Sequence, residues 1–275
     1  MLCALVTIFG IGMSESYQRE IPRRRAKRQG RKLEQDPPLS GATFGEMFKI
    51  TVIDPNLQVF TEPLVAMTTF ILIFNFAVVM QFIITVPVAL RSPPPVGPGF
   101  SITQVGLAFT AVIAGAGLAG LTVIMIEQVV TGMISKRNIP AFATIEYRLI
   151  PSVLGTLIVT AALLWIGSTV GNPDFPPIVP IIGSAVFVWG VAMIIFSIIP
   201  YLFDAYPPAG TLAALTAGAC GRLAFAGALP LVILQFFTGV TPRWALYIFG
   251  FISIPIWAIP FVLFRYGPIM REKSK

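Results

Sequence analysis

The 275-residue sequence contains no histidine and few charged residues of either sign. Charged residues make up 11% of the chain, whereas an ordinary soluble domain has about 25%. So few charges cannot cover a surface that faces water on all sides. The lack of histidine also removes the commonest general base and the commonest metal ligand. These shortages favour a membrane environment and argue against a histidine-based enzyme or metal site.

Cysteine is also scarce, and Cys220, one of only two, lies inside a long apolar block. This position argues against a disulfide framework and a cysteine metal site. Walker-type phosphate loops and nucleophile–base pairs are missing as well, so no ATP-driven pump, catalytic residue, metal or cofactor is predicted. The net charge of +7 is attributed to membrane orientation rather than to nucleic acid, because most basic residues lie between or beyond the apolar blocks.

Long apolar blocks are what the sequence has in abundance, and 56% of its residues are hydrophobic. Crossing the ~30 Å hydrocarbon core takes ~20 apolar residues in a helix that rises ~1.5 Å per residue. Continuous apolar runs favour helices over barrel strands, in which polar and apolar residues alternate. The predicted fold class is therefore an all-α membrane protein with six spans, at residues 64–90, 101–126, 149–170, 178–203, 210–237 and 244–264.

Lysine and arginine are distributed unevenly between the two sides that six spans define. Sixteen of the 19 basic residues fall on the side that holds both ends of the six-span unit. The opposite side carries only Arg91 and Arg243, and Arg222 lies inside the fifth predicted span. Because basic residues are enriched in cytoplasmic loops, we expect both ends in the cytoplasm.

The amino-terminal residues 1–13 are apolar but too short to span, since they reach only ~20 Å as a helix. A basic run follows them, whereas a signal peptide carries its basic region first. We therefore predict the truncated end of a preceding span at 1–13, followed by a basic cytoplasmic connecting segment at 14–60. The six-helix transmembrane bundle is expected at 61–265, and a cytoplasmic tail at 266–275.

Several short motifs occur at the edges of the predicted spans, in a fixed order along the chain. S-E-S-Y lies at residues 14–17, F-T-E-P at 60–63 and E-Y-R-L at 146–149. Y-L-F-D-A-Y-P lies at 201–207, and Arg222 precedes an L-P-L at 229–231. In this order, the motifs are similar to those of the second half of fungal drug:proton antiporters of the major facilitator superfamily.

The resemblance to this twelve-span branch implies proton-coupled export of drugs, polyamines or secondary metabolites. It implies a carboxyl-terminal six-helix bundle, with small organic molecules and protons as the transported species. The family has two six-span halves with the substrate between them, and this chain resembles only the second. A missing amino-terminal half, or a second copy of this chain, is therefore an expected partner alongside the lipid bilayer.

Charged residues at the span edges, and one within a span, are the candidates for a transport role. The resemblance implies a cytoplasmic charge network that locks one conformation, containing Glu146, Arg148, Asp204 and Glu62. Glu127 lies at the same predicted face. The alternative is that charges gather at membrane edges simply because they are costly within the membrane. Arg222 is the only charge within the predicted spans, near the bilayer midplane, where it must find acceptors or extend to the membrane edge.

Polar and aromatic residues within the spans are candidates for a substrate cavity. Tryptophan also favours the membrane interface, so packing and lipid contact remain alternatives. The candidates are Asn75, Gln81, Trp189 and Gln235.

Two functions from different classes follow from these observations. The first is a membrane transporter, present as a half or truncated form of an exporter, in the plasma membrane or alternatively the vacuolar membrane. The second is a non-transporting membrane protein, such as a degenerate fragment or an assembly partner. A six-span membrane enzyme is disfavoured, because histidine and clustered polar residues are missing.

Overall fold

The structure is a computed structural model that describes residues 53–93, 97–137, 145–170, 172, 175–205, 215–216, 218–225, 227–229, 241–256 and 258–273. All of them belong to one compact unit, Phe48–Lys275. The described residues form helices and connecting turns without a strand. The predicted all-α class is therefore confirmed for the described residues. The segment predicted at 1–13 and most of the one predicted at 14–60 lie outside the described residues.

Five helical stretches are long and apolar enough to cross a membrane. Helix α5 (Pro63–Arg91) is one, and α6 (Ile102–Ala108) with α7 (Thr110–Arg137) forms the next. The short 3-10 helix η4 (Glu146–Leu149) leads into α8 (Ile150–Thr169). The fourth stretch is α9 (Ile178–Ala205), and α11 (Pro242–Ile256) with α12 (Ala258–Lys273) supplies the fifth. The chain is therefore a multi-pass integral membrane protein.

The fifth predicted span, at 210–237, is described only in part. A shorter apolar helix, Gly218–Leu229, lies within it. One short helix not predicted from the sequence, α4 (Asp54–Thr61), precedes α5. It occupies the end of the predicted connecting segment, and the exposed Leu57 and Phe60 lie on it.

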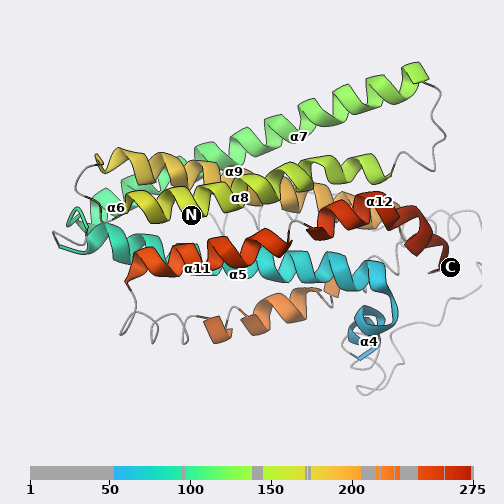
Figure 1. The fold of residues 1–275 in the computed structure, drawn as a ribbon, viewed down its shortest axis with the longest axis horizontal. Coiled ribbons are helices and arrows are strands. Elements are labelled where there is room, and N and C mark those ends of the chain that lie inside the picture. Colours follow the sequence, from blue (N-terminus) through green and yellow to red (C-terminus); the bar gives the residue numbers. More distant parts are fainter. Residues whose placement is uncertain are drawn as a thin grey trace, which may run out of the picture. The chain divides into compact units, whose positions relative to one another are not determined.

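Apolar side chains between α5, α8 and α9 form the main core, to which α11 and α12 add. Phe82 of α5 stacks on Phe187 of α9, with ring centroids 4.4 Å apart. Glycines allow α8 and α9 to approach closely, because a Cβ added at Gly155 of α8 would lie 2.7 Å from the carbonyl oxygen of Gly190 in α9. The helices run back and forth, so α5, α8 and α9 each connect the same two ends of the bundle (Figure 1).

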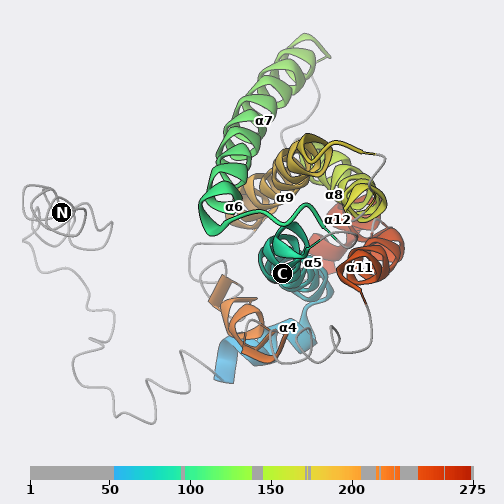
Figure 2. The same ribbon diagram turned by 90° about the vertical axis from the view of Figure 1, so that its left-hand side faces the viewer.

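Helix α7 packs differently from the other long helices. It contacts α9 through Ala119 and Val123, and Trp189 of α9 donates a hydrogen bond to Thr122 at 3.1 Å. Its carboxyl-terminal part runs away from α8 and α9, as Figures 1 and 2 show. Within the stretch Ile102–Met133, which α6 and α7 form, 17% of the most apolar 18-residue segment is buried. About half of the corresponding segment is buried in α5, α8 and α9. One helix of the bundle thus has a largely unpacked end.

Candidate functional site

An ion pair joins η4 to α9 at the end of the bundle where α9 finishes. Nη1 of Arg148 lies 3.0 Å from Oδ2 of Asp204. Both side chains are partly exposed, so the pair is screened by water and adds little to stability. The pair brings together two of the predicted site residues. We call this end of the bundle the η4 end.

The backbone around Arg148 is held in place by local hydrogen bonds. The Arg148 amide donates to the Ile145 carbonyl at 3.1 Å, and the Ser197 hydroxyl of α9 donates to the Arg148 carbonyl. The turn therefore stays attached to α9, two turns before Asp204. Pro151 lies in the first turn of α8, where its missing N–H leaves no helix hydrogen bond unmade.

Asp204 is placed where its charge is unfavourable without a cation. It lies in the last turn of α9, which has no basic residue, and the carboxyl end of a helix carries a partial negative charge. Arg148 supplies the compensating positive charge from the neighbouring element. The pair thus places a positive charge beside an acidic helix end, where α9 itself has no basic residue.

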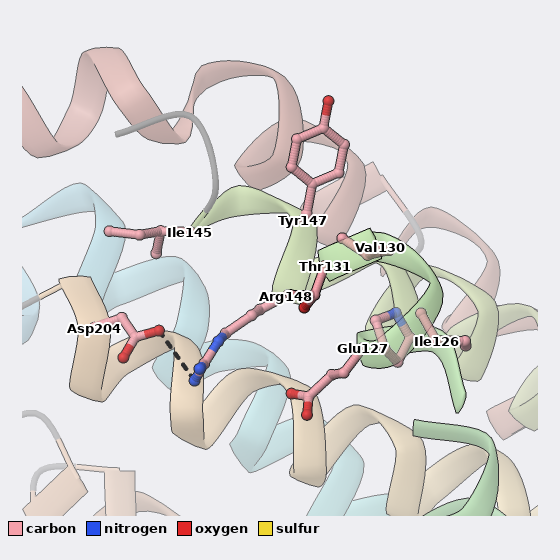
Figure 3. Close-up of a pocket in the computed structure, with 9 residues that line it drawn as sticks. Ile126, Glu127, Val130, Thr131, Ile145, Tyr147, Arg148 and Asp204 are labelled. Carbon is pink, nitrogen blue, oxygen red and sulfur yellow. Dashed lines mark ion pairs between the residues drawn. The ribbon is translucent and has the colours of Figure 1, made fainter. Parts of the chain in front are cut away.

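The ion pair lines a pocket of about 230 Å³ between η4, α8, α9 and α7. Apolar walls come from Ile126 and Val130 of α7 and Pro151 of α8. Glu127 of α7 contributes a second carboxylate, and Figure 3 shows Arg148 extended toward Asp204 with Glu127 lining the same space. The pocket therefore contains one cation and two anions, from three different elements.

Glu146 was expected in the same network, but its side chain lies elsewhere. It is 4% exposed and does not line the pocket. A Cβ added at Gly267 of α12 would lie 3.4 Å from Cγ of Glu146 and 3.1 Å from the hydroxyl of Tyr201. The structure thus places Glu146 beside Tyr201 and α12. Although Glu146 is only two residues from Arg148, it lies outside the pocket that Arg148 lines.

Glu62 is half-buried and occupies the residue before α5. Its carbonyl accepts the amide of Ala66 at 2.9 Å, which continues the helix hydrogen bonding into α5. It does not line the pocket that contains Arg148. The structure therefore places Glu62 as a helix-start residue rather than beside the ion pair.

Arg222 is half-buried on the helix Gly218–Leu229, beside the middle of α5. A Cβ added at the neighbouring Gly221 would meet the Ile73 side chain at 2.3 Å. Ile73 lies ten residues into α5, or ~15 Å from its start at ~1.5 Å per residue. Among the described residues, none forms an ion pair or hydrogen bond with the Arg222 side chain. Arg222 thus lies beside the middle of α5, and its acceptor is not among the described residues.

The proposed cavity residues that the structure describes lie between helices. Asn75 donates to the Val191 carbonyl of α9 at 3.3 Å, and Gln81 donates to Thr85 at 3.0 Å. Both side chains are buried, and their carbonyl oxygens have no hydrogen-bond partner within the described part of the chain. Trp189 joins α9 to α7 through its bond to Thr122, and Gln235 lies outside the described residues.

Glu127 is the pocket residue that the sequence-based set of site residues omitted. Its position as the first charge after a long apolar run was the available signal, but many span ends carry such a charge. Only the path of α7 shows that it shares a pocket with Arg148. Within the described ranges, no group of three acidic or cysteine side chains is arranged to hold a metal ion.

Comparison with known proteins shows that the chain is similar in sequence to fungal efflux pumps. The chain is 27% identical over 269 residues to the efflux pump FUBT of Fusarium oxysporum, which covers 95% of this chain and 44% of the pump. It is 28% identical to the MFS-type efflux pump MFS2 of Trichophyton rubrum, over 85% of this chain and 38% of that protein. The major facilitator superfamily multidrug transporter FLU1 of Candida albicans is 28% identical, over 84% and 37%.

No family model and no solved structure matches the chain. The relatives are membrane transporters rather than enzymes, and the long apolar helices agree with them. The chain is a homologue of the fungal efflux pumps of the major facilitator superfamily, which confirms the resemblance seen in the span-edge motifs. It spans less than half the length of these curated relatives.

Proposed function

We propose that this chain is the carboxyl-terminal six-helix half of a proton-coupled exporter of small organic molecules. The observation that supports this best is the similarity to efflux pumps over 95% of the chain and 44% of the pump. Five membrane-length helices and the shorter Gly218–Leu229 helix supply six candidate spans in this half. Drugs, polyamines and secondary metabolites are the proposed substrate classes.

In this proposal the η4 end faces the cytoplasm, because most lysines and arginines lie on that side of the six spans. The Arg148–Asp204 pair then joins η4 to α9 at the cytoplasmic edge, as part of a network that stabilises one conformation. Alternating access moves one bundle against the other, and we propose that this network at the bundle edge rearranges during that movement. A partly exposed pair suits this role, since breaking it costs little.

Arg222 is the proposed central residue of the half. An arginine near the bilayer midplane costs about 2.5–3.5 kcal/mol on insertion scales unless it faces protein or water. No acidic residue lies within the six predicted spans of this chain, so the proposed acceptors are the substrate or an acidic residue on the other half. Both would lie in the cavity between the two bundles.

The function is tested by supplying the other half. The chain is co-expressed in yeast with the amino-terminal half of the Candida albicans transporter FLU1, and efflux of a fluorescent organic cation is measured with and without a proton gradient. Gradient-dependent efflux is expected only when both halves are present, because one bundle forms only one wall of the cavity. Two inserted halves that never export, or a purified monomer that exports alone, would contradict the proposal.

A further inference from the structure

One arginine and two carboxylates line the pocket at the η4 end. Arg148 contacts Asp204 through Nη1 and Oδ2, which lie 3.0 Å apart. A guanidinium group has five N–H donors, so this contact leaves donors available for a second carboxylate. Glu127 has no ion pair with any residue in the described ranges, yet its side chain lines the same pocket. The arrangement therefore contains more anions than the present pairing uses.

Arg148 and Asp204 both belong to the well-packed part of the bundle. The carbonyl of Arg148 accepts the Ser197 hydroxyl of α9, which fixes η4 on that helix. Tyr201 and Leu202, just before Asp204, are 0% and 1% exposed. A change of partner for Arg148 therefore needs no movement of η4 relative to α9.

Helix α7 is the least buried of the long helices that line the pocket. Its packing against α9 ends near Ile126, which lies beside the buried pair Ala119 and Val123. Beyond that point Val129 is 60% exposed and Met133 is 52% exposed. Glu127 directly follows Ile126, so a tilt of this end of α7 toward η4 brings its carboxylate closer to Arg148.

We infer that Glu127 is an alternative partner for Arg148, which competes with Asp204 and so positions the end of α7. With Arg148 on Asp204, α7 stays splayed and the pocket is open, as the structure shows. With Arg148 on Glu127, α7 approaches η4 and the pocket closes. Its meaning for transport rests on the proposed function, since closing at this end would then be part of the conformational cycle.

The test measures the position of α7 without any transport assay. Spin labels are attached at Met133→Cys on α7 and Leu154→Cys on α8, two exposed sites outside the pocket, after Cys3 and Cys220 are replaced by serine. Distances between the labels are measured by pulsed electron paramagnetic resonance in the purified full chain in nanodiscs. Asp204→Asn removes the competing carboxylate, so we expect the distances to shift toward shorter values.

Control variants assign that shift to the Glu127 carboxylate. Glu127→Gln added to Asp204→Asn should return the distances to the parent distribution, and so should Asp204→Glu in place of Asp204→Asn. Gln128→Glu, added to the Asp204→Asn, Glu127→Gln pair, puts a carboxylate about 100° further around α7 and should not restore the short distances.

Unchanged distances in Asp204→Asn, or a shift that persists with Glu127→Gln, would overturn the inference. Each variant is first checked for the parent helical content and elution volume. Where a variant that carries Glu127→Gln misfolds, the comparison of Asp204→Asn with Asp204→Glu tests the inference instead. A shift of α7 together with absent efflux would refute the proposed function while leaving this inference standing.

Discussion

Nη1 of Arg148 lies 3.0 Å from Oδ2 of Asp204, although the two side chains keep exposed fractions of 41% and 35%. The pair joins the start of one membrane helix to the end of another. Its exposure means that solvent screens most of the attraction, so its value is in fixing a geometry rather than in stabilising the fold.

The stability contribution of this pair is therefore expected to be small. A double-mutant cycle with Arg148→Gln and Asp204→Asn should give a coupling energy of about 0.2–1 kcal/mol in thermal unfolding in detergent. Salt at 1 M, where the Debye length is ~3 Å, should reduce it further. A coupling of several kcal/mol that salt does not change would show that the pair is a buried structural contact.

The glycine contact between α8 and α9 should matter far more to stability. Gly155→Ala would bring a Cβ to within 2.7 Å of the Gly190 carbonyl oxygen, which is backbone and cannot rotate away. We expect a loss of about 1–3 kcal/mol, as for other overpacked sites, seen as a lower melting temperature.

Gly117→Ala in α7 is the matched control for that substitution. A Cβ there would meet no atom within 4 Å, so the variant should be neutral or slightly stabilising, because alanine has the higher helix propensity. Equal losses from the two substitutions would mean that the α8–α9 crossing is not the cause.

Arg222 should be needed for transport but not for insertion. In the two-half system, Arg222→Ala should reach the membrane at least as well as the parent, because a costly charge is removed. Efflux should be abolished, and Arg222→Lys should restore only part of it, since lysine lacks the planar set of donors. Parent-level efflux from Arg222→Ala at equal membrane abundance would show that the charge is incidental.

Most of the fold could be predicted from the sequence because hydrocarbon imposes a simple rule. The lengths of the continuous apolar runs predicted spans at 64–90 and 178–203, which are close to helices α5 and α9 of the structure. The break between α6 and α7 at Phe109 was not predicted, since the apolar run continues through it. The exposure of apolar side chains in α7 could not be predicted either, because buried positions and lipid-facing positions both favour apolar residues.

The site could be predicted only in part from the sequence, because its residues converge from separate elements. Arg148 and Asp204 were named together through motif resemblance, and the structure pairs them. Glu146, two residues from Arg148, was assigned to the same network, but it packs beside Tyr201 and Gly267. Glu127 joins the pocket through the direction in which α7 leaves the bundle, which no local pattern encodes.

A six-span bundle with both ends in the cytoplasm is the central prediction, and cysteine labelling tests it directly. Single cysteines are placed at Pro95, Asn172, Thr241 and Asn138 in a chain without Cys3 and Cys220, and intact cells are treated with an impermeant thiol reagent. The first three positions should react from outside, and Asn138 should react only after permeabilisation. Labelling of Asn138 in intact cells, or protection of the other three, would contradict the account.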